Sequence, residues 1–184
     1  MAVLGNHLAG AVAVLAAAGL LCAPAGAAQV HEHDVKAAFL FNFTRFVEWP
    51  AGRPEATEPF RLCVLADDVT AKAVERTMKG ESVQGHPARI VVPQSAQEAR
   101  FCQILFVGRS EMDRAAPLLS AVRDLPVLTV GDADRFVAGG GTIQFVLDQG
   151  RVRFDVNLES AKRAGLTISS RLLRVARHIG GQAQ

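Results

Sequence analysis

The sequence predicts an α/β protein, namely a three-layer α/β/α sandwich with a mostly parallel sheet and a C-terminal antiparallel hairpin. Between residues 61 and 130, short runs rich in Val, Ile and Leu alternate with stretches of helical periodicity. Strands that are apolar along their whole length are typical of a parallel sheet covered by helices on both faces. After residue 140, two strand-like runs flank Asp148-Gln149-Gly150, which is a hairpin signal.

The first element of the predicted domain is a helix in the stretch 36–50, with Val35 as the first residue of its apolar stripe. Its apolar side chains recur every three or four residues, so one face should pack against the sheet. Pro50 cannot continue the helix and should therefore end it, and Trp49 before Pro50 should adopt an extended conformation. The predicted core-facing stripe consists of Val35, Ala38, Phe39, Asn42, Phe43 and Phe46.

Phe41 lies off this stripe, on the side that carries Ala37, Thr44, Arg45 and Glu48. A soluble helix normally shows small or polar groups there, so an extra aromatic side chain suggests a surface for a partner. An equally good explanation is that another layer of the same domain covers Phe41. We hypothesise a partner or dimer interface that consists of Phe41, Arg45, Glu48 and Trp49.

The remaining strands and helices alternate along the chain. Ser95 and Ser110 each begin a capping-box pattern, in which the serine hydroxyl and a later carboxylate bond free backbone amides. Asn157 should cap a short helix that Gly165 ends. Predicted strands cover residues 61–66, 89–92, 104–107, 127–130, 142–147 and 151–157, and predicted helices cover 70–79, 95–100, 110–123, 158–163 and 169 or 170 to 178.

Residues 1–28 are predicted to be a signal peptide that is removed after Ala27 or Ala28. This segment contains no Asp, Glu, Lys or Arg, and residues 8–21 form an apolar run too short to span a bilayer comfortably. Residues 29–184 then form a single exported domain. We expect the mature protein in the periplasm.

Charge and composition argue against nucleic-acid binding and against catalysis. The net charge is +2 and no run of Lys or Arg is present to follow a phosphate backbone. The four histidines of the mature chain show no triad pattern, and the glycine run 139–141 lacks the ending of a phosphate loop and fits a tight turn. His31 could join a copper or nickel site at a new amino terminus, but a solvated helix start explains His31 and His33 more simply. We expect no enzyme activity, no cofactor and no metal.

Two cysteines remain in the mature chain, since Cys22 belongs to the predicted signal peptide. Cys63 and Cys102 both lie in strand-like segments, so an exported protein would be expected to join them in a disulfide. Closing so long a loop would stabilise the fold by about 3–4 kcal/mol. The alternative is a pair of small buried hydrophobic residues.

Three loops should meet at the carboxyl edge of the parallel strands, where open α/β sheets bind ligands. These loops cover residues 66–68, 108–110 and 131–132. Arg109 and Ser110, next to a helix start, could hold a small anion there. Arg109 could equally be an ordinary surface residue.

Six sequence blocks carry a resemblance to a known family: KAAFLFNFTRFVEWP, FRLCVLADD, CQILFVG, PVLTVGD, GGTIQF and GRVRFDVNLESAKRAGLTISSRLLRVA. In this order, over about residues 35–176, they resemble the YfiR-type periplasmic proteins. The resemblance implies an α/β sandwich that often dimerises, and it implies that Cys63 and Cys102 correspond to one disulfide of the family. A second pair, near the glycine-rich turn, has no counterpart here.

The resemblance also implies a function. Such proteins repress an inner-membrane diguanylate cyclase by binding its periplasmic part, and an OmpA-like outer-membrane lipoprotein sequesters the repressor. We therefore expect a regulator that lowers cyclic di-GMP and biofilm formation by protein–protein contact, acting as a homodimer. The alternative is a periplasmic protein that binds a small ligand.

Overall fold

The computed structural model describes residues 25–55 and 57–180 of the 184-residue chain. Within these ranges, the burial of side chains is described from residue 32 onward. Most of the predicted signal peptide and the side chain of His31 lie outside this part. The signal peptide and its cleavage position therefore stay predictions.

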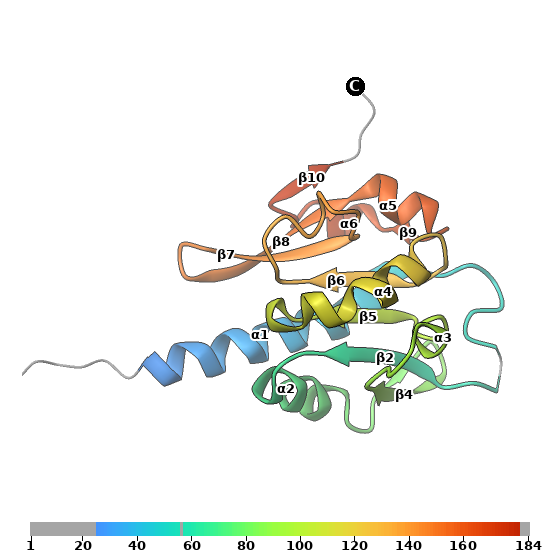
Figure 1. Ribbon diagram of the computed structural model, residues 1–184, viewed down its shortest axis with the longest axis horizontal. Helices are drawn as coiled ribbons and strands as arrows, with labels where there is room; N and C mark the ends of the chain where they lie inside the picture. The colour runs from blue at the N-terminus through green and yellow to red at the C-terminus, as the bar shows by residue number, and fades with distance from the viewer. Residues whose placement is uncertain (1–24, 56, 181–184) are drawn as a thin grey trace, which may run out of the picture.

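An eight-stranded sheet forms the middle layer (Figure 1). β2, β4, β5, β6 and β7 pair in parallel, and β8 pairs with β7 as an antiparallel hairpin. The predicted fold class is thereby confirmed. In spatial order the strands are β10 (His178–Gly180), β8 (Arg151–Asn157), β7 (Ile143–Asp148), β6 (Leu128–Gly131), β5 (Ile104–Val107), β2 (Phe60–Leu65), β4 (His86–Val91) and β3 (Ser82–Val83).

Helices cover both faces of this sheet. Alternate residues of β2 point to opposite sides: Leu62 and Val64 join one buried cluster, and Cys63 and Leu65 join another. The first cluster lies under α1 (Ala25–Phe46) and α2 (Asp68–Met78), and the second lies under α3 (Ala96–Ala99) and α4 (Met112–Val122). Figure 1 shows α4 in front of β5 and β6 and α1 behind them. Two short helices, α5 (Leu158–Arg163) and α6 (Ser170–Leu173), follow the hairpin.

Aromatic rings fasten α1 to the hairpin. Phe43 lies 5.8 Å from Phe145 of β7 and 5.3 Å from Phe154 of β8, measured between ring centroids. Phe39 lies 6.0 Å and 5.5 Å from the same two rings. Such stacked and edge-to-face pairs add to the stabilisation that burial already supplies. The helix and the hairpin therefore share one core.

The buried side of α1 differs from the predicted stripe. Ala38 and Asn42, assigned to the stripe, are exposed, whereas Ala37 and Thr44, assigned to the opposite side, are buried. α2 packs along α1, and Val83 of β3 belongs to the same buried cluster, so the helix has neighbours on two adjoining faces. The buried positions of this segment are Lys36, Ala37, Leu40, Phe43, Thr44 and Val47.

Both ends of the predicted domain contain a short strand in place of helix. α1 ends at Phe46, before Pro50, because β1 (Val47–Glu48) pairs with β9 (Thr167–Ile168). The last helix, predicted to reach His178, is only the four-residue α6. His178 instead begins β10, which pairs in parallel with β8. In both places a strand partner far away in sequence overrides the local helical pattern.

Most predicted caps are confirmed. The side chains of Ser95 and Asn157 accept the amides of Glu98 and Ser160, at 3.2 Å and 3.0 Å. The capping box predicted at Ser110 is wrong: a 3₁₀ turn (η1, Arg109–Glu111) leads into α4 without a side-chain cap. The backbone amide of Arg109 is bonded to Asp132 from another loop, so tertiary contacts shape this helix start.

Candidate functional site

The amino-terminal half of α1 reaches the carboxyl edge of the sheet through Lys36. The Lys36 ammonium group lies 2.5 Å from a carboxylate oxygen of Asp132, in the loop after β6, and 2.7 Å from Glu32 one helical turn earlier. Burial alone would lower the pKa of Lys36, but hydrogen bonds and charges from Asp132 and Glu32 outweigh it and raise the pKa. Lys36 is therefore charged and fixes α1 to this edge.

The predicted anion site lies beside this pair. The Arg109 backbone amide donates to Asp132 at 2.6 Å, and its guanidinium contacts the Asp132 carbonyl at 3.1 Å and the Asp134 carboxylate at 3.3 Å. Asp132 thus links Lys36 and Arg109. An anion at Arg109 and Ser110 would compete with two carboxylates that are already present, and the anion site stays a prediction.

A second group of polar contacts holds α1 against α2. Thr70 at the start of α2 contacts the Nδ1 atom of His33 and donates its hydroxyl proton to Asp67 at 2.9 Å. Further along α2, Arg76 pairs with Asp34 at 2.8 Å in an exposed position. In the part of the chain that the structure describes, no group of three His, Cys, Asp or Glu residues is placed to hold a metal ion. The contacts of His33 and Asp34 both join α1 to α2.

Phe41 and Arg45 form the central part of the predicted interface. The Arg45 guanidinium lies 4.9 Å from the centre of the half-buried Phe41 ring, and Arg45 itself is exposed. Both side chains border an open hollow of about 330 Å³ whose other wall is the β3 turn at Ser82 and Gln84. We call Phe41, Arg45, Ser82 and Gln84 the Phe41 surface. The underside of Phe41 packs on the core, so a layer of the domain covers part of this ring.

Glu48 and Trp49 lie outside the lining of this hollow. Glu48 is exposed on the short strand β1. The Trp49 indole N–H donates to the carbonyl of Gln103 at 3.1 Å, and its ring packs edge-on against Phe60 at 5.2 Å. Trp49 therefore anchors the end of the helix segment to the sheet, and only part of its ring is available to a partner.

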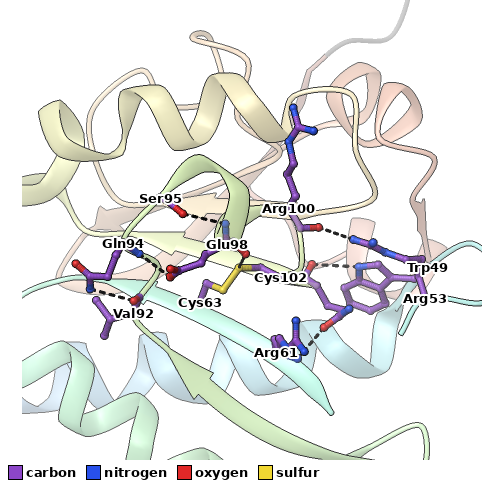
Figure 2. The surroundings of a disulfide bond; sticks show 11 residues. Trp49, Arg53, Arg61, Cys63, Val92, Gln94, Ser95, Glu98, Arg100 and Cys102 are labelled. Atoms are coloured by element: carbon purple, nitrogen blue, oxygen red, sulfur yellow. Dashed lines mark hydrogen bonds between the residues drawn. A yellow bond between two sulfur atoms is a disulfide. The ribbon is translucent and has the colours of Figure 1, made fainter. Parts of the chain in front are cut away.

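Cys63 and Cys102 form a disulfide, as predicted (Figure 2). The two Cα atoms are 5.8 Å apart, and both residues are buried under α3 and α4. The bond joins β2 to the segment between α3 and β5. Nearby, Arg53 donates to the carbonyl of Arg100 at 2.7 Å, so a second contact ties the loop after Trp49 to the same segment (Figure 2).

Sequence reasoning missed the Lys36–Asp132 pair. Lys36 lies outside the predicted core-facing stripe of the first helix, although it is only 7% exposed. Lys36 lies next to Ala37 and one turn before Leu40, and this position indicates that its side chain is buried. A buried lysine needs an acidic partner, so the sequence does contain a signal for an ion pair. The partner itself could be sought among the acids that follow the parallel strands, which include Asp132.

These features define a class of protein. It is an α/β sandwich in which a disulfide links two segments of the sheet region, and its first helix carries a phenylalanine–arginine pair beside an open hollow. The chain belongs to the YfiR/HmsC-like family, whose model matches residues 33–177. This family is regulatory rather than catalytic, and its members are periplasmic regulators of cyclic di-GMP signalling in general. In the described residues, no helix is long and apolar enough to cross a membrane.

Solved structures show the same fold at low sequence identity. A conserved domain protein from Vibrio cholerae O1 biovar El Tor strain N16961 matches with a TM-score of 0.54 and 9% identity over 80% of this chain. The ABC domain in complex with L-Trp from Streptococcus pneumonia matches with a TM-score of 0.54 and 13% identity over 81%. This chain spans 60% of the length of either structure. A search of curated proteins finds no match.

Proposed function

We propose that this protein represses an inner-membrane diguanylate cyclase by binding its periplasmic part, and so lowers cyclic di-GMP and biofilm formation. Membership of the YfiR/HmsC-like family supports the regulatory class. The disulfide between Cys63 and Cys102 is in keeping with an oxidising compartment such as the periplasm. We therefore propose two specific points: the partner is a diguanylate cyclase, and binding lowers its activity.

The Phe41–Arg45 pair is the observation that carries the choice of contact surface. Aromatic and arginine side chains dominate the binding energy of protein interfaces, particularly where they border a hollow that a partner side chain can fill. Arg45 has no carboxylate partner among the described residues, so its charge is free to meet an acidic group of the cyclase. Glu48 would contribute one more charge at the rim, and Trp49 would hold this end of the helix in place.

The Phe41 surface of one chain could form either a homodimer or the cyclase complex, but not both at once. We propose that the protein dimerises. We also propose that an OmpA-like outer-membrane lipoprotein competes with the cyclase for binding to the repressor. Binding of the lipoprotein would remove the repressor from the inner membrane and release cyclase activity. In this arrangement the level of cyclic di-GMP depends on which partner covers the repressor.

Gene deletion followed by complementation tests this function. Deletion should raise cellular cyclic di-GMP, and the wild-type gene should restore the lower level. Phe41→Ala and Arg45→Glu should each fail to restore it, because a lost interface anchor weakens association by about 2 kcal/mol, or about 30-fold.

Asn42→Ala is the matched control, since Asn42 is exposed on the same helix but does not border the hollow. This variant should complement fully. An unchanged cyclic di-GMP level after deletion, under several growth conditions, would contradict the repressor function. Normal complementation by both Phe41→Ala and Arg45→Glu would contradict only the choice of surface.

A further inference from the structure

A cavity of about 270 Å³ lies on the α4 side of the sheet, away from the Phe41 surface. Its lining comes from α4, from β6 and the loop between β6 and β7, and from α5 with its C-cap. Its volume is just below the range of about 300–1,000 Å³ that is typical of pockets for drug-sized ligands. A smaller metabolite would therefore fill it. The apolar part of its lining consists of Met112, Ala116, Leu119, Val122, Val127 and Phe136.

The inner end of the cavity offers a hydrogen-bond donor. Thr129 and Thr142 both line it and are only 6% and 2% exposed. Their hydroxyl oxygens are 3.1 Å apart, and the Thr142 amide donates to the Thr129 oxygen at 3.0 Å. One hydroxyl proton is used between the two oxygens, and the other has no acceptor among the described residues. That proton is available to an acceptor atom of a ligand.

The outer end of the cavity is positively charged. Arg123 and Arg135 line it, both are exposed, and neither pairs with a carboxylate among the residues described by the structure. Asp134 also lies at this end, but its carboxylate contacts Arg109 at 3.3 Å. The mouth therefore attracts an anion, and guanidinium groups bind carboxylates especially well because their donors match the two oxygens.

One wall of the cavity has a fixed shape because Phe136 is held between two glycines. A Cβ atom at Gly131 or Gly141 would lie 2.5 Å or 2.2 Å from the Phe136 ring, so neither position has room for a larger residue. Arg135, just before Phe136, has a φ of 61°, in the left-handed region that few residues other than glycine adopt. The loop is thus built around a buried aromatic ring, and it presents Arg135 at the mouth.

We propose that this cavity binds a small carboxylic acid with an apolar body. The carboxylate would pair with Arg123 and Arg135 at the mouth, and the body would pack against α4 and Phe136. An acceptor at the far end of the ligand would take the free hydroxyl proton of the threonine pair. Binding at this site does not require the cyclase, so the proposal stands or falls separately from the repressor function.

Calorimetric titration of the mature, disulfide-bonded protein with 4-hydroxyphenylacetate tests this site. We expect saturable binding with one site per chain and a dissociation constant in the millimolar range or tighter. The neutral analogue 4-hydroxyphenylacetamide has almost the same shape and should bind at least about tenfold more weakly, because it lacks the charge. Phenylacetate, which lacks the far hydroxyl group, should also bind more weakly than 4-hydroxyphenylacetate.

Three variants locate the binding on the protein. The double variant Arg123→Ala/Arg135→Ala should weaken binding of 4-hydroxyphenylacetate about tenfold or more. Ala116→Phe should abolish it by filling the cavity, and Ala116 is exposed, so this change should leave the fold intact. Arg114→Ala is the control, because it removes a positive charge from the same helix but does not line the cavity. It should bind normally.

Several results would overturn the proposal. These are no saturable binding of 4-hydroxyphenylacetate at millimolar concentrations, equal binding of the amide, or undiminished binding by Ala116→Phe. A thermal melt of each variant without ligand shows whether it is folded. Failure of the repressor experiments alone would leave the titration results unaffected.

Discussion

The ammonium group of Lys36 and the carboxylate of Asp132, 96 positions apart in sequence, lie 2.5 Å from each other at the carboxyl edge of the sheet. The Lys36 and Asp132 side chains are only 8% and 16% exposed. Asp132 also accepts the backbone amide of Arg109. One carboxylate thus connects the first helix, the loop after β6 and the start of α4.

Lys36→Met should lower the free energy of unfolding by about 2–3 kcal/mol, because it leaves the Asp132 carboxylate without its buried partner. A double-mutant cycle with Asp132→Asn should give a coupling energy of about 1–3 kcal/mol in denaturant unfolding. Arg76→Gln is the matched control: it breaks the exposed pair with Asp34 and should cost less than about 0.5 kcal/mol. Equal losses in the free energy of unfolding for the two variants would show that the Lys36–Asp132 pair is no more stabilising than an exposed pair.

The contribution of Lys36 to the free energy of unfolding should be constant across neutral pH. Its pKa is raised in the folded state, so the stabilisation is fully present below the ordinary value of 10.5 and is lost only as pH rises through the raised value. The stability difference between wild type and Lys36→Met should therefore be the same at pH 6 and pH 8, within about 0.5 kcal/mol. A difference that disappears between these two pH values would show that Lys36 loses its charge there.

Phe43→Ala should lower the free energy of unfolding by about 3–5 kcal/mol, because Phe43 is completely buried among other aromatic rings. Phe41→Ala should cost much less, since Phe41 is only half-buried. Its main effect should be on association, which sizing of each variant next to its thermal melt would detect. If Phe41→Ala melts as low as Phe43→Ala, the Phe41 ring belongs to the core and the interface proposal is wrong.

The exported protein should contain no free thiol. Alkylation without reductant should leave Cys63 and Cys102 unmodified in a mass spectrum, because they are joined in a buried disulfide. Reduction should lower the free energy of unfolding by about 3–4 kcal/mol, the value expected for a loop of this length. Replacement of both cysteines by alanine provides the control, since reductant should not affect that variant. Alkylation of both cysteines in the native protein would remove the disulfide prediction.

Acid should destabilise the protein partly through Asp67, which caps α2. Burial alone would raise the pKa of Asp67, but hydrogen bonds from Thr70 and Val69 and the charge of His33 outweigh it and lower the pKa. Stabilisation from a lowered pKa is present above the ordinary value and is lost as pH falls through the lowered one. Asp67→Asn should therefore lose less stability than wild type between about pH 5 and pH 2, measured by chemical denaturation. Parallel curves for the two proteins would exclude this role.

Local sequence was sufficient for many elements of the fold. The Asp148-Gln149-Gly150 turn predicts the β7–β8 hairpin, and Asn157 predicts the start of α5, because turn and cap geometry depend on neighbouring residues only. The disulfide was predictable for a different reason: once the signal peptide is set aside, only Cys63 and Cys102 remain to pair.

Tertiary contacts decided the rest. Periodicity shows that α1 has an apolar side, but which side is buried depends on α2 and β3, and these bury Ala37 and Thr44 in place of Ala38 and Asn42. Val47–Glu48 and His178–Gly180 become strands because distant partners satisfy their backbone hydrogen bonds. Only the packing of the layers brings Lys36 next to Asp132. The same packing places Arg123 and the Gly139–Gly141 turn in the lining of one cavity. The sequence by itself determined most of the helices and strands and their order, because these depend on local periodicity, turns and caps. The terminal strands, the buried face of each helix and the assembly of each site required contacts between residues far apart in the chain.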